Sequence, residues 1–456
     1  MPKYFGTDGF RGESNVSLTI NHAYKIGRFL GWYYSKDRGP HCSKILVGKD
    51  TRLSCYMLEY ALLAGIAASG CDAYNMHVTT TPSVSYITRT QFFDCGIMIS
   101  ASHNPYYENG IKLFSSLGEK MNDSFLDMVE EYMERDTLKD DIPLATRDRI
   151  GKVIDYMDAR IMYSGFLTTC VNTPLSSLHI LLDTANGASY NLAPTVFKRL
   201  GANVDVINNT PDGTNINKNA GSTHIEGLQK IMREGKYDVA FAFDGDSDRC
   251  IAVDKTGAVI NGDRIMYIYA SYLKEQGELD TNTVVTTVMS NMGLYKALER
   301  KGIDYVQTKV GDRFVHEYMI EHNNIIGGEQ SGHIIMSKYL NTGDGILTSL
   351  VLSEIMVKTG KTLLELSQDM TDYPQYLVNV VISDKDAVMS DDDIKRKIDE
   401  VKLSLGDKGR VLVRPSGTEP VIRVMSEAEK QKDAENAVER IVQELRDKGY
   451  FKGVRK

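Results

Sequence analysis

The sequence lacks long apolar runs, paired cysteines and an excess of positive charge. Its longest apolar stretches, such as residues 61–68, are much shorter than the roughly 20 residues of a membrane-spanning helix. The amino-terminal residues MPKYFGTDGFRG contain no apolar signal segment, so we expect a cytoplasmic protein without a membrane partner. The six cysteines include no C-x-x-C pair, which indicates free thiols and argues against a zinc site.

The charge balance excludes one class of partner. The net charge of −8 argues against a broad nucleic-acid surface, which needs a basic footprint. A local group of Arg and Lys can still bind a phosphorylated small molecule on an acidic protein. At 456 residues the chain is too long for one ordinary core, so we expect several domains.

Short apolar runs alternate with helical periodicity along the chain, which predicts an α/β fold. Strands are expected at residues 45–47, 96–99, 180–182 and 239–243, and several of them stop at polar clusters. In an α/β sheet, this is the usual appearance of a strand that enters a functional loop. Helical faces are expected at Leu58, Leu62 and Ile66, and at Val438, Ile441, Val442 and Leu445.

The segment Asp244-Gly-Asp-Ser-Asp-Arg249 directly follows a predicted buried strand. Its three carboxylates at alternate positions can gather around one hard cation. An EF-hand calcium loop would need Gly at its sixth position and Glu at its twelfth, where this chain has Arg249 and Lys255. A solvated acidic turn is the plainer alternative, but its aspartates would repel one another without compensation. We therefore favour a metal site.

The segment Ile99-Ser-Ala-Ser-His-Asn-Pro105 also follows a strand. A nucleophile elbow would need Gly two residues before and after the serine, where Ser102 has Ser100 and Asn104. Neighbours in sequence usually point apart, so Ser102 and His103 cannot be assumed to act as a pair. By its residues alone this segment is a polar turn.

Two further loops carry groups suited to a phosphosugar. In Arg414-Pro-Ser-Gly-Thr-Glu-Pro-Val-Ile-Arg423, a turn flanked by two arginines can bind phosphate, although a charged hairpin is the alternative. In Gly327-Gly-Glu-Gln-Ser-Gly-His333, the Glu, Ser and His side chains suit sugar hydroxyls.

Taken in this order along the chain, the four segments resemble the α-D-phosphohexomutase superfamily from Phe5 to about Met425. The segments Phe5–Arg11 and Asn109–Lys112 agree with that resemblance. It implies that Ser102 carries a phosphoryl group, and that Mg²⁺ is held by phosphorylated Ser102, Asp244, Asp246 and Asp248. It also implies sugar contacts from Glu329, Ser331, His333, Arg249 and Lys309, and phosphate contacts from Arg414, Ser416, Gly417, Thr418 and Arg423.

Within the superfamily the sequence most resembles the phosphoglucosamine mutase family. The distinguishing features are Gln330 and the segments 221–224, 309–313 and 342–345. Two residues depart from the usual pattern: Ser247 stands where the metal loop usually has Gly, and Phe10 where Ile is common. Neither change removes a carboxylate ligand.

The resemblance implies three similar α/β domains and a smaller α+β domain around a central cleft, with one motif in each. The expected boundaries are 1–152 with the phosphoserine loop, 153–257 with the metal loop, 258–370 with the sugar loop, and 371–456 with the phosphate loop.

The implied reaction interconverts the 6-phosphate and 1-phosphate of glucosamine through phosphorylated Ser102 and a bound 1,6-bisphosphate, which also serves as activator. The expected cofactor is one Mg²⁺ per subunit, and the expected partner is a phosphosugar; a homodimer is left open. Arg11, Lys112 and Arg249 are expected cations at the site. Lys112, with a lowered pKa, is the first candidate for general base and His333 the second.

Three alternatives remain at this point. The same chemistry on mannose or glucose phosphate differs only in the substrate. A metal-dependent sugar phosphatase would let water take the phosphoryl group from the serine. A non-catalytic sensor would have no need to keep nucleophile, metal ligands and phosphate loop together.

Overall fold

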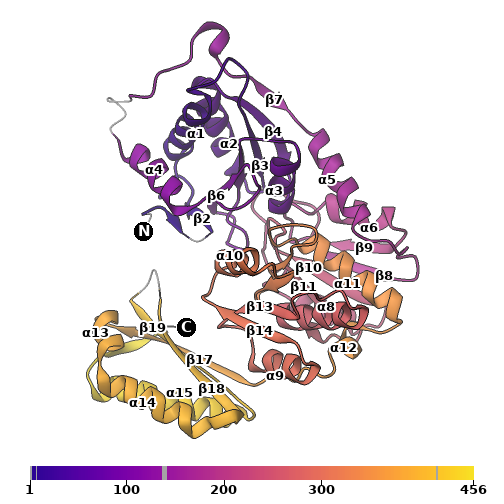
Figure 1. The fold of residues 1–456 in the computed structure, drawn as a ribbon, viewed down its shortest axis with the longest axis vertical. Coiled ribbons are helices and arrows are strands. Elements are labelled where there is room, and N and C mark those ends of the chain that lie inside the picture. The colour runs from indigo at the N-terminus through magenta and orange to yellow at the C-terminus, as the bar shows by residue number, and fades with distance from the viewer. Residues whose placement is uncertain (1–2, 7, 136–140, 417–419, 456) are drawn as a thin grey trace. The chain divides into compact units, whose positions relative to one another are not determined.

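A computed structural model describes residues 3–6, 8–135, 141–416 and 420–455 (Figure 1). The chain divides into two compact units, residues 1–289 with 303–368 and residues 290–302 with 369–456. Within the described residues the strands form four sheets. No helix in these described ranges combines the length and the apolar character that crossing a membrane requires.

The first sheet has the strand order β1-β2-β6-β5-β3-β4-β7. Strands β3, β4, β5 and β7 run parallel, and β6 returns antiparallel to β5. Its strands are β1 (Phe5–Gly6), β2 (Gly9–Glu13), β3 (Lys44–Lys49), β4 (Asp72–Val78), β5 (Cys95–Ile99), β6 (Glu108–Ser115) and β7 (Val153–Asp155). Its helices are α1 (Ile20–Ser35), α2 (Cys55–Ala68), α3 (Thr81–Thr90) and α4 (Asp123–Glu134).

The second sheet has the order β12-β11-β10-β8-β9, with β8, β9 and β10 parallel and β10 paired with β11 as a hairpin. Its strands are β8 (His179–Asp183), β9 (Asn203–Ile207), β10 (Val239–Phe243), β11 (Cys250–Asp254) and β12 (Val259–Ile260). The helices of this region are α5 (Asp158–Thr169), α6 (Leu192–Arg199) and α7 (Glu226–Met232). Strand β10 is buried along its whole length, as its run of apolar residues predicted.

The third sheet has the order β14-β13-β15-β16. Its strands are β13 (Thr283–Thr287), β14 (Asp304–Thr308), β15 (Ile326–Gly328) and β16 (Ile334–Met336). Helix α8 (Gly262–Gln276) precedes these strands, and the helices that separate or follow them are α9 (Met292–Lys301), α10 (Asp312–His322), α11 (Gly345–Thr359) and α12 (Leu363–Leu366). Helix α11 begins where the Asp344 side chain accepts a hydrogen bond from Leu347 N–H, and it ends at Gly360 in the left-handed conformation (φ 67°).

The fourth sheet is antiparallel, with the order β18-β19-β17-β20. Its strands are β17 (Gln375–Ile382), β18 (Gly409–Pro415), β19 (Val421–Ala428) and β20 (Phe451–Arg455), with helices α13 (Lys385–Ser390), α14 (Asp392–Leu405) and α15 (Gln431–Asp447). Helices α14 and α15 lie along this sheet in the yellow part of the ribbon (Figure 1). The apolar stripe of α15 packs into the core of this region, which confirms the predicted helical face from Val438 to Leu445.

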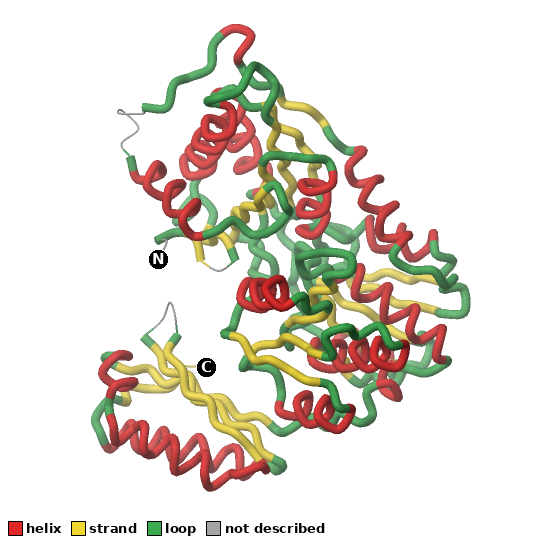
Figure 2. Tube along the Cα trace, in the orientation of Figure 1, coloured by secondary structure: helices red, strands yellow, loops and turns green. Residues whose placement is uncertain are grey.

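The expected fold class is confirmed: three α/β regions precede a carboxy-terminal region with an antiparallel sheet, and Figure 2 shows helices and strands in each. All four predicted strand segments fall inside β3, β5, β8 and β10. Leu58, Leu62 and Ile66 are fully buried on α2, as their spacing predicted. The four domain boundaries stay a prediction; the second compact unit includes α9, which precedes residue 370 in the chain.

Candidate active site

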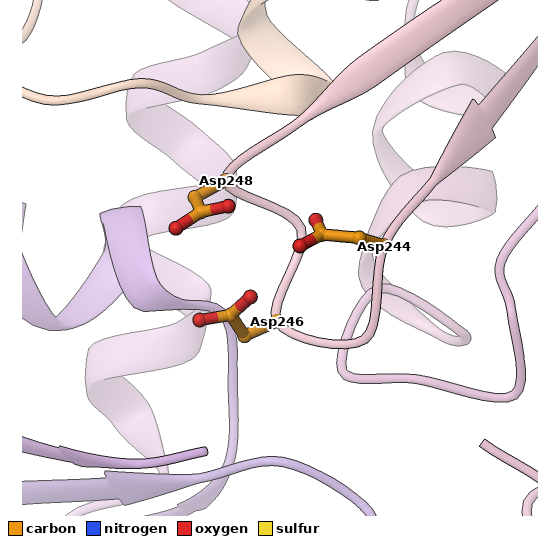
Figure 3. A group of neighbouring side chains, drawn as sticks. All are labelled: Asp244, Asp246 and Asp248. Carbon is orange, nitrogen blue, oxygen red and sulfur yellow. The ribbon is translucent and has the colours of Figure 1, made fainter. Parts of the chain in front are cut away.

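Three aspartates converge in the loop that joins β10 to β11. Asp244, Asp246 and Asp248 each offer a carboxylate oxygen, and these oxygens lie within 4.8 Å of one another. All three side chains are buried, and Figure 3 shows them directed into one small space. The hairpin makes this possible because its two strands hold both ends of a short loop. The predicted gathering of the three carboxylates is therefore observed.

The backbone of this loop explains the usual preference for glycine at position 247. Ser247 has φ 62°, in the left-handed region that glycine adopts most readily. Its carbonyl oxygen accepts a hydrogen bond from Gly345 N–H at 2.9 Å, which helps to hold this conformation. Gly245 is required for a different reason, since a Cβ there would lie 2.5 Å from the carbonyl oxygen of Ser102. The loop thus approaches the serine segment as closely as backbone atoms allow.

Two carboxylate oxygens of the cluster have no hydrogen-bond partner among the described residues and could bind a cation. Asp246 Oδ2 accepts from Thr81 Oγ1 at 2.5 Å and from Lys112 Nζ at 2.7 Å, and Asp248 Oδ2 accepts from Lys112 Nζ at 3.2 Å. The buried Oδ1 atoms of Asp246 and Asp248 find no hydrogen-bond donor among the described residues. A buried polar atom without a partner costs free energy, and a hard cation satisfies carboxylate oxygens. The carboxylate oxygens of the three aspartates are therefore suitable ligands for Mg²⁺.

The pKa values of the aspartates differ because their neighbours differ. Burial and the charges of Asp248 and Asp246 raise the pKa of Asp244 well above its usual value. Burial alone would raise the pKa of Asp248 too, but Lys112, His333 and Arg249 together hold it well below its usual value. The cluster thus carries concentrated negative charge that one divalent cation can neutralise.

Ser102 lies beside this cluster. It follows β5 closely in the chain and is fully buried. Its hydroxyl donates to Asp244 Oδ2 at 2.5 Å, and its Oγ is 3.4 Å from His103 Nδ1. Arg249 Nη1 lies 2.8 Å from the same His103 nitrogen, and burial, Arg249 and Arg11 lower the pKa of His103 to about 4. His103 is therefore neutral near pH 7.

Lys112, on β6, is charged in this setting. Burial lowers its pKa, but Asp246, Asp248 and Asp8 outweigh burial and hold the pKa well above its usual value. The expectation from the sequence that the pKa of Lys112 is lowered is therefore wrong in the environment that the protein's own side chains create. The reason is that three carboxylates, and not neighbouring cations, dominate the environment of the amine.

His333 and Lys112 belong to one closed set of alternating acidic and basic side chains. Each member is within 4.0 Å of the next by its charged atoms. In order around the set, the members are Asp248, Lys112, Asp8, Lys120, Asp312 and His333. They come from the regions of the first, second and third sheets, so this set ties those three regions together at the metal loop.

The ring of His333 is enclosed by protein groups. Its Nδ1 lies 3.8 Å from Asp248 Oδ1, and its Nε2 lies 3.3 Å from Asp312 Oδ2 and 3.1 Å from Gly343 N. Burial lowers the pKa of His333, but Asp312 and Asp248 raise it above its usual value. A general base needs a ring nitrogen directed at the proton that it removes. Here both nitrogens of His333 face protein groups.

The predicted sugar loop lies between β15 and β16. Glu329 Oε1 accepts Gly311 N–H at 3.1 Å, while burial and the charge of Asp312 raise the pKa of Glu329. Ser331 and Lys309 are exposed. A cavity of about 210 Å³ adjoins this region and is lined by residues that include Lys120, Asp312, His316, His333 and Thr342. The loop thus presents a carboxylate acceptor and an exposed hydroxyl, and its role in sugar binding stays a prediction.

The predicted phosphate loop lies in the other compact unit, where β18 and β19 form a hairpin. Arg414 and Arg423 are directly opposite each other in the antiparallel pair. Burial and the charge of Arg423 lower the pKa of Arg414, and Arg423 Nε finds no hydrogen-bond acceptor among the described residues. Like charges that face each other are destabilising, and an anion between them removes the repulsion. Ser416 is buried, while Gly417 and Thr418 lie outside the described residues.

Several groups around the cluster were not found from the sequence. Thr81 binds Asp246, and Asp8 and Asp312 pair with lysines of the charged set. Thr81 follows β4 within a polar run, so the search for polar residues after strands could have found it. Asp8 and Asp312 belong to the segments 5–11 and 309–313, but their role depends on contacts between regions far apart in the chain.

Comparison with known families covers nearly the whole chain. Models described as phosphoglucomutase/phosphomannomutase alpha/beta/alpha domain I, II and III match residues 2–140, 157–257 and 261–373. The model of the C-terminal domain of the same family matches residues 377–444.

Individual relatives agree with these matches. A phosphoglucosamine mutase from Lachnospira eligens is 54% identical over 99% of this chain and 100% of its own length. One from Bacillus cereus (strain B4264) is 46% identical over 97% of this chain and 98% of its own length.

Solved structures share the fold. A phosphoglucomutase/phosphomannomutase family protein from Burkholderia thailandensis has a TM-score of 0.83 at 21% identity, with both chains fully covered. N-acetylphosphoglucosamine mutase from Aspergillus fumigatus, in complex with GlcNAc-6P and magnesium, has a TM-score of 0.70 at 18% identity and covers 98% of this chain and 96% of its own.

Proposed function

Because the chain belongs to the phosphoglucosamine mutase family of the α-D-phosphohexomutase superfamily, whose members are isomerases, we propose that it interconverts glucosamine 6-phosphate and glucosamine 1-phosphate. The observation that carries this proposal is the buried contact between Ser102 Oγ and Asp244, at the edge of a carboxylate cluster with unpartnered oxygens. The product would serve the synthesis of amino-sugar nucleotides and cell-wall precursors.

Ser102, once phosphorylated, is the proposed phosphoryl donor. The bond between Ser102 Oγ and phosphorus breaks as the oxygen of the free sugar hydroxyl bonds to phosphorus. That hydroxyl loses its proton and Ser102 Oγ gains one, which gives a 1,6-bisphosphate and an unmodified serine. The intermediate then reverses its orientation in the site, and its other phosphoryl group is transferred to Ser102 Oγ. A 1,6-bisphosphate supplied from solution would restore phosphate to an enzyme that has lost it, and so acts as activator.

Positive groups surround the proposed transfer site. Asp244, Asp246, Asp248 and the phosphorylated Ser102 would hold Mg²⁺, and the bound ion would neutralise charge on the phosphoryl group. Phosphoryl transfer depends mainly on positioning and charge stabilisation. We therefore assign Lys112, Arg11 and Arg249 to the charge of the phosphoryl group. Lys112 pairs with Asp246, Arg11 pairs with Asp8, and Arg249 Nε lies 4.0 Å from Asp248 Oδ1.

The sugar loop and the phosphate loop are proposed to bind the rest of the substrate. Glu329, Ser331 and Lys309 would contact the sugar, and His333 is assigned to the same site because its ring lines the adjoining cavity although both of its nitrogens face protein groups. Arg414, Ser416 and Arg423 would bind the phosphate that does not react. Both sites must accept the intermediate in two orientations, since either of its phosphates ends at Ser102. Planar guanidinium ions, which can bind a phosphate through two parallel hydrogen bonds, suit this task better than a closed apolar pocket would.

A coupled assay with Mg²⁺ tests the proposed function. Glucosamine 6-phosphate, mannose 6-phosphate and glucose 6-phosphate are compared, each primed with its own 1,6-bisphosphate. We expect a strong preference for the glucosamine sugar. A preference for mannose or glucose would keep the mechanism and overturn the substrate. Hydrolysis without isomerisation would support a phosphatase, and neither reaction in protein shown by mass to carry phosphate on Ser102 would contradict the proposal.

Arg423→Ala should mainly weaken substrate binding. A hydrogen bond to a charged group contributes about 1.5–3 kcal/mol, so we expect KM to rise by about 10- to 100-fold with a smaller change in kcat. Steady-state kinetics with glucosamine 6-phosphate measures both constants. Arg396→Ala, on the exposed face of α14, is the matched control and should leave KM unchanged. An unchanged KM in Arg423→Ala would remove this side chain from the phosphate site.

A further inference from the structure

Ser102 has a backbone conformation that serine rarely adopts. Its φ is 51°, in the left-handed region, and the residue is fully buried. A non-glycine residue in this region is strained and persists only where the surrounding structure determines it. The conformation therefore needs a cause in the groups that contact the Ser102 backbone.

Both polar backbone atoms of Ser102 are held by side chains. Its N–H donates to Ser100 Oγ at 2.9 Å. Its carbonyl oxygen accepts from Arg52 Nη2 at 2.8 Å and from Asn217 Nδ2 at 2.9 Å. Such bonds on both sides of one residue fix its peptide planes, and so fix the direction of its side chain.

Arg52 makes more of the hydrogen bonds that hold the Ser102 segment than Asn217 does. It is completely buried, and its five N–H groups all have acceptors. Its Nε pairs with Asp50 Oδ2 at 2.8 Å, and that oxygen also accepts from Ser100 Oγ at 2.7 Å. Its four remaining hydrogen bonds go to carbonyl oxygens of the serine loop, at Ser102, Asn104, Pro105 and Glu108. Arg52 thus holds the backbone of the loop in place from Ser102 to Glu108.

Asn217 adds a contact from the region of the metal loop. Its side-chain amide donates to the carbonyl oxygens of Ser102 and Asn104, at 2.9 and 3.2 Å. Its own backbone N–H donates to Ala185 O at 2.9 Å, and its φ is 58°. Gly245 lies close to the same carbonyl oxygen of Ser102, since a Cβ at Gly245 would be 2.5 Å from it. Asn217 therefore couples the position of Ser102 to the loop that carries the three aspartates.

We propose that Arg52 and Asn217 are positioning residues that hold Ser102 in its left-handed conformation and thereby direct its Oγ at the carboxylate cluster. The inference rests on the proposed function of Ser102 as phosphoryl carrier. Neither side chain contacts the reacting oxygen, so each acts only through the backbone of Ser102. Their loss should slow phosphoryl transfer and leave the binding of the sugar phosphate unchanged.

Asn217→Gly is the sharpest test. Glycine tolerates the positive φ of this position, so the change removes the amide without adding backbone strain. A small displacement of a reacting group can slow a reaction by about 100-fold, and we expect kcat to fall by about tenfold or more at unchanged KM. Asn219→Gly is the matched control, because Asn219 also has a positive φ, 51°, but is exposed. The kcat and KM of the Asn219→Gly variant should equal those of the wild type.

A second measurement separates positioning from general destabilisation. Intact-mass spectrometry follows how fast dephosphorylated protein takes phosphate from a sugar 1,6-bisphosphate onto Ser102, and thermal unfolding is recorded for each variant. We expect slower uptake in Asn217→Gly with a melting temperature close to that of Asn219→Gly. Normal kcat and normal uptake in Asn217→Gly, or a fall in kcat matched by an equal rise in KM, would overturn the inference.

Two more variants keep the test decisive if Asn217→Gly folds poorly. Asn217→Asp has the same shape but turns a carboxylate toward two carbonyl oxygens, so it should slow phosphate uptake at least as much. Arg52→Lys keeps a positive charge beside Asp50 but offers one nitrogen in place of three, and it should also lower kcat. Wild-type protein that takes up phosphate on Ser102 but isomerises no sugar would contradict the proposed function and leave this inference intact.

Discussion

Ser102→Ala should abolish the phosphoenzyme and lower kcat by about 10⁴-fold or more. In the proposed mechanism every phosphoryl group passes through Ser102 Oγ, and removal of a covalent nucleophile commonly has an effect of this size. Alanine keeps the Cβ of serine and lacks only the hydroxyl, so the change adds no bulk and removes the hydrogen bond to Asp244. Intact-mass measurement after incubation with a sugar 1,6-bisphosphate should show no added phosphate, and the coupled assay should show no isomerisation above background.

The control for this experiment is an exposed serine from the same region. Ser116→Ala, just after β6, should keep both the phosphate and the turnover of the wild type. A phosphate that persists in Ser102→Ala would place the nucleophile on another residue. Substantial turnover without any phosphoenzyme would contradict the two-step mechanism itself.

Mg²⁺ should stabilise the folded protein, and Asp246→Asn should remove most of that effect. The buried Oδ1 atoms of Asp246 and Asp248 are without donors among the described residues, so a bound cation relieves their mutual repulsion. A ligand at about 100 times its dissociation constant adds about 2.7 kcal/mol of stability. The measurement is the melting temperature as a function of Mg²⁺ concentration, which does not depend on activity.

For Asp246→Asn we expect Mg²⁺ to bind about 100-fold more weakly, because the affinity for hard cations follows the number of charged ligands. The Mg²⁺ concentration that gives half-maximal activity should rise accordingly, and a chelator should inactivate the wild type reversibly. Asp280→Asn, an exposed aspartate before β13, is the control and should respond to Mg²⁺ as the wild type does. If Mg²⁺ left the melting temperature of the wild type unchanged, the cluster would not be a magnesium site.

Local patterns allowed four strands, two helices and the metal loop to be predicted. The run 239–243 is apolar throughout, which indicates a buried strand, and it becomes β10. Asp244, Asp246 and Asp248 stand at alternate positions of one short loop, so their proximity needs only that loop to turn. Arg414 and Arg423 could be assigned to one site for the same reason, since a hairpin brings them opposite each other.

The charge state of Lys112 could not be predicted in the same way. Its sequence neighbours give no sign of the carboxylates that hold its ammonium protonated, because Asp8, Asp246 and Asp248 come from other segments. The sign of a pKa shift depends on which charges lie within a few ångströms of the group and how far it is buried. Only the packing of the regions of the first and second sheets fixes those distances.

The sequence by itself thus determined the α/β architecture, the family and the residue types of the site, since these follow from periodicity and short segments. The tertiary structure alone decided how Ser102 is held. Arg52 is fifty residues before it and Asn217 over a hundred after it, and no local pattern links either to the Ser102 carbonyl oxygen. The left-handed conformation of Ser102 is strained, so it is stable only where hydrogen bonds from distant segments meet at one peptide.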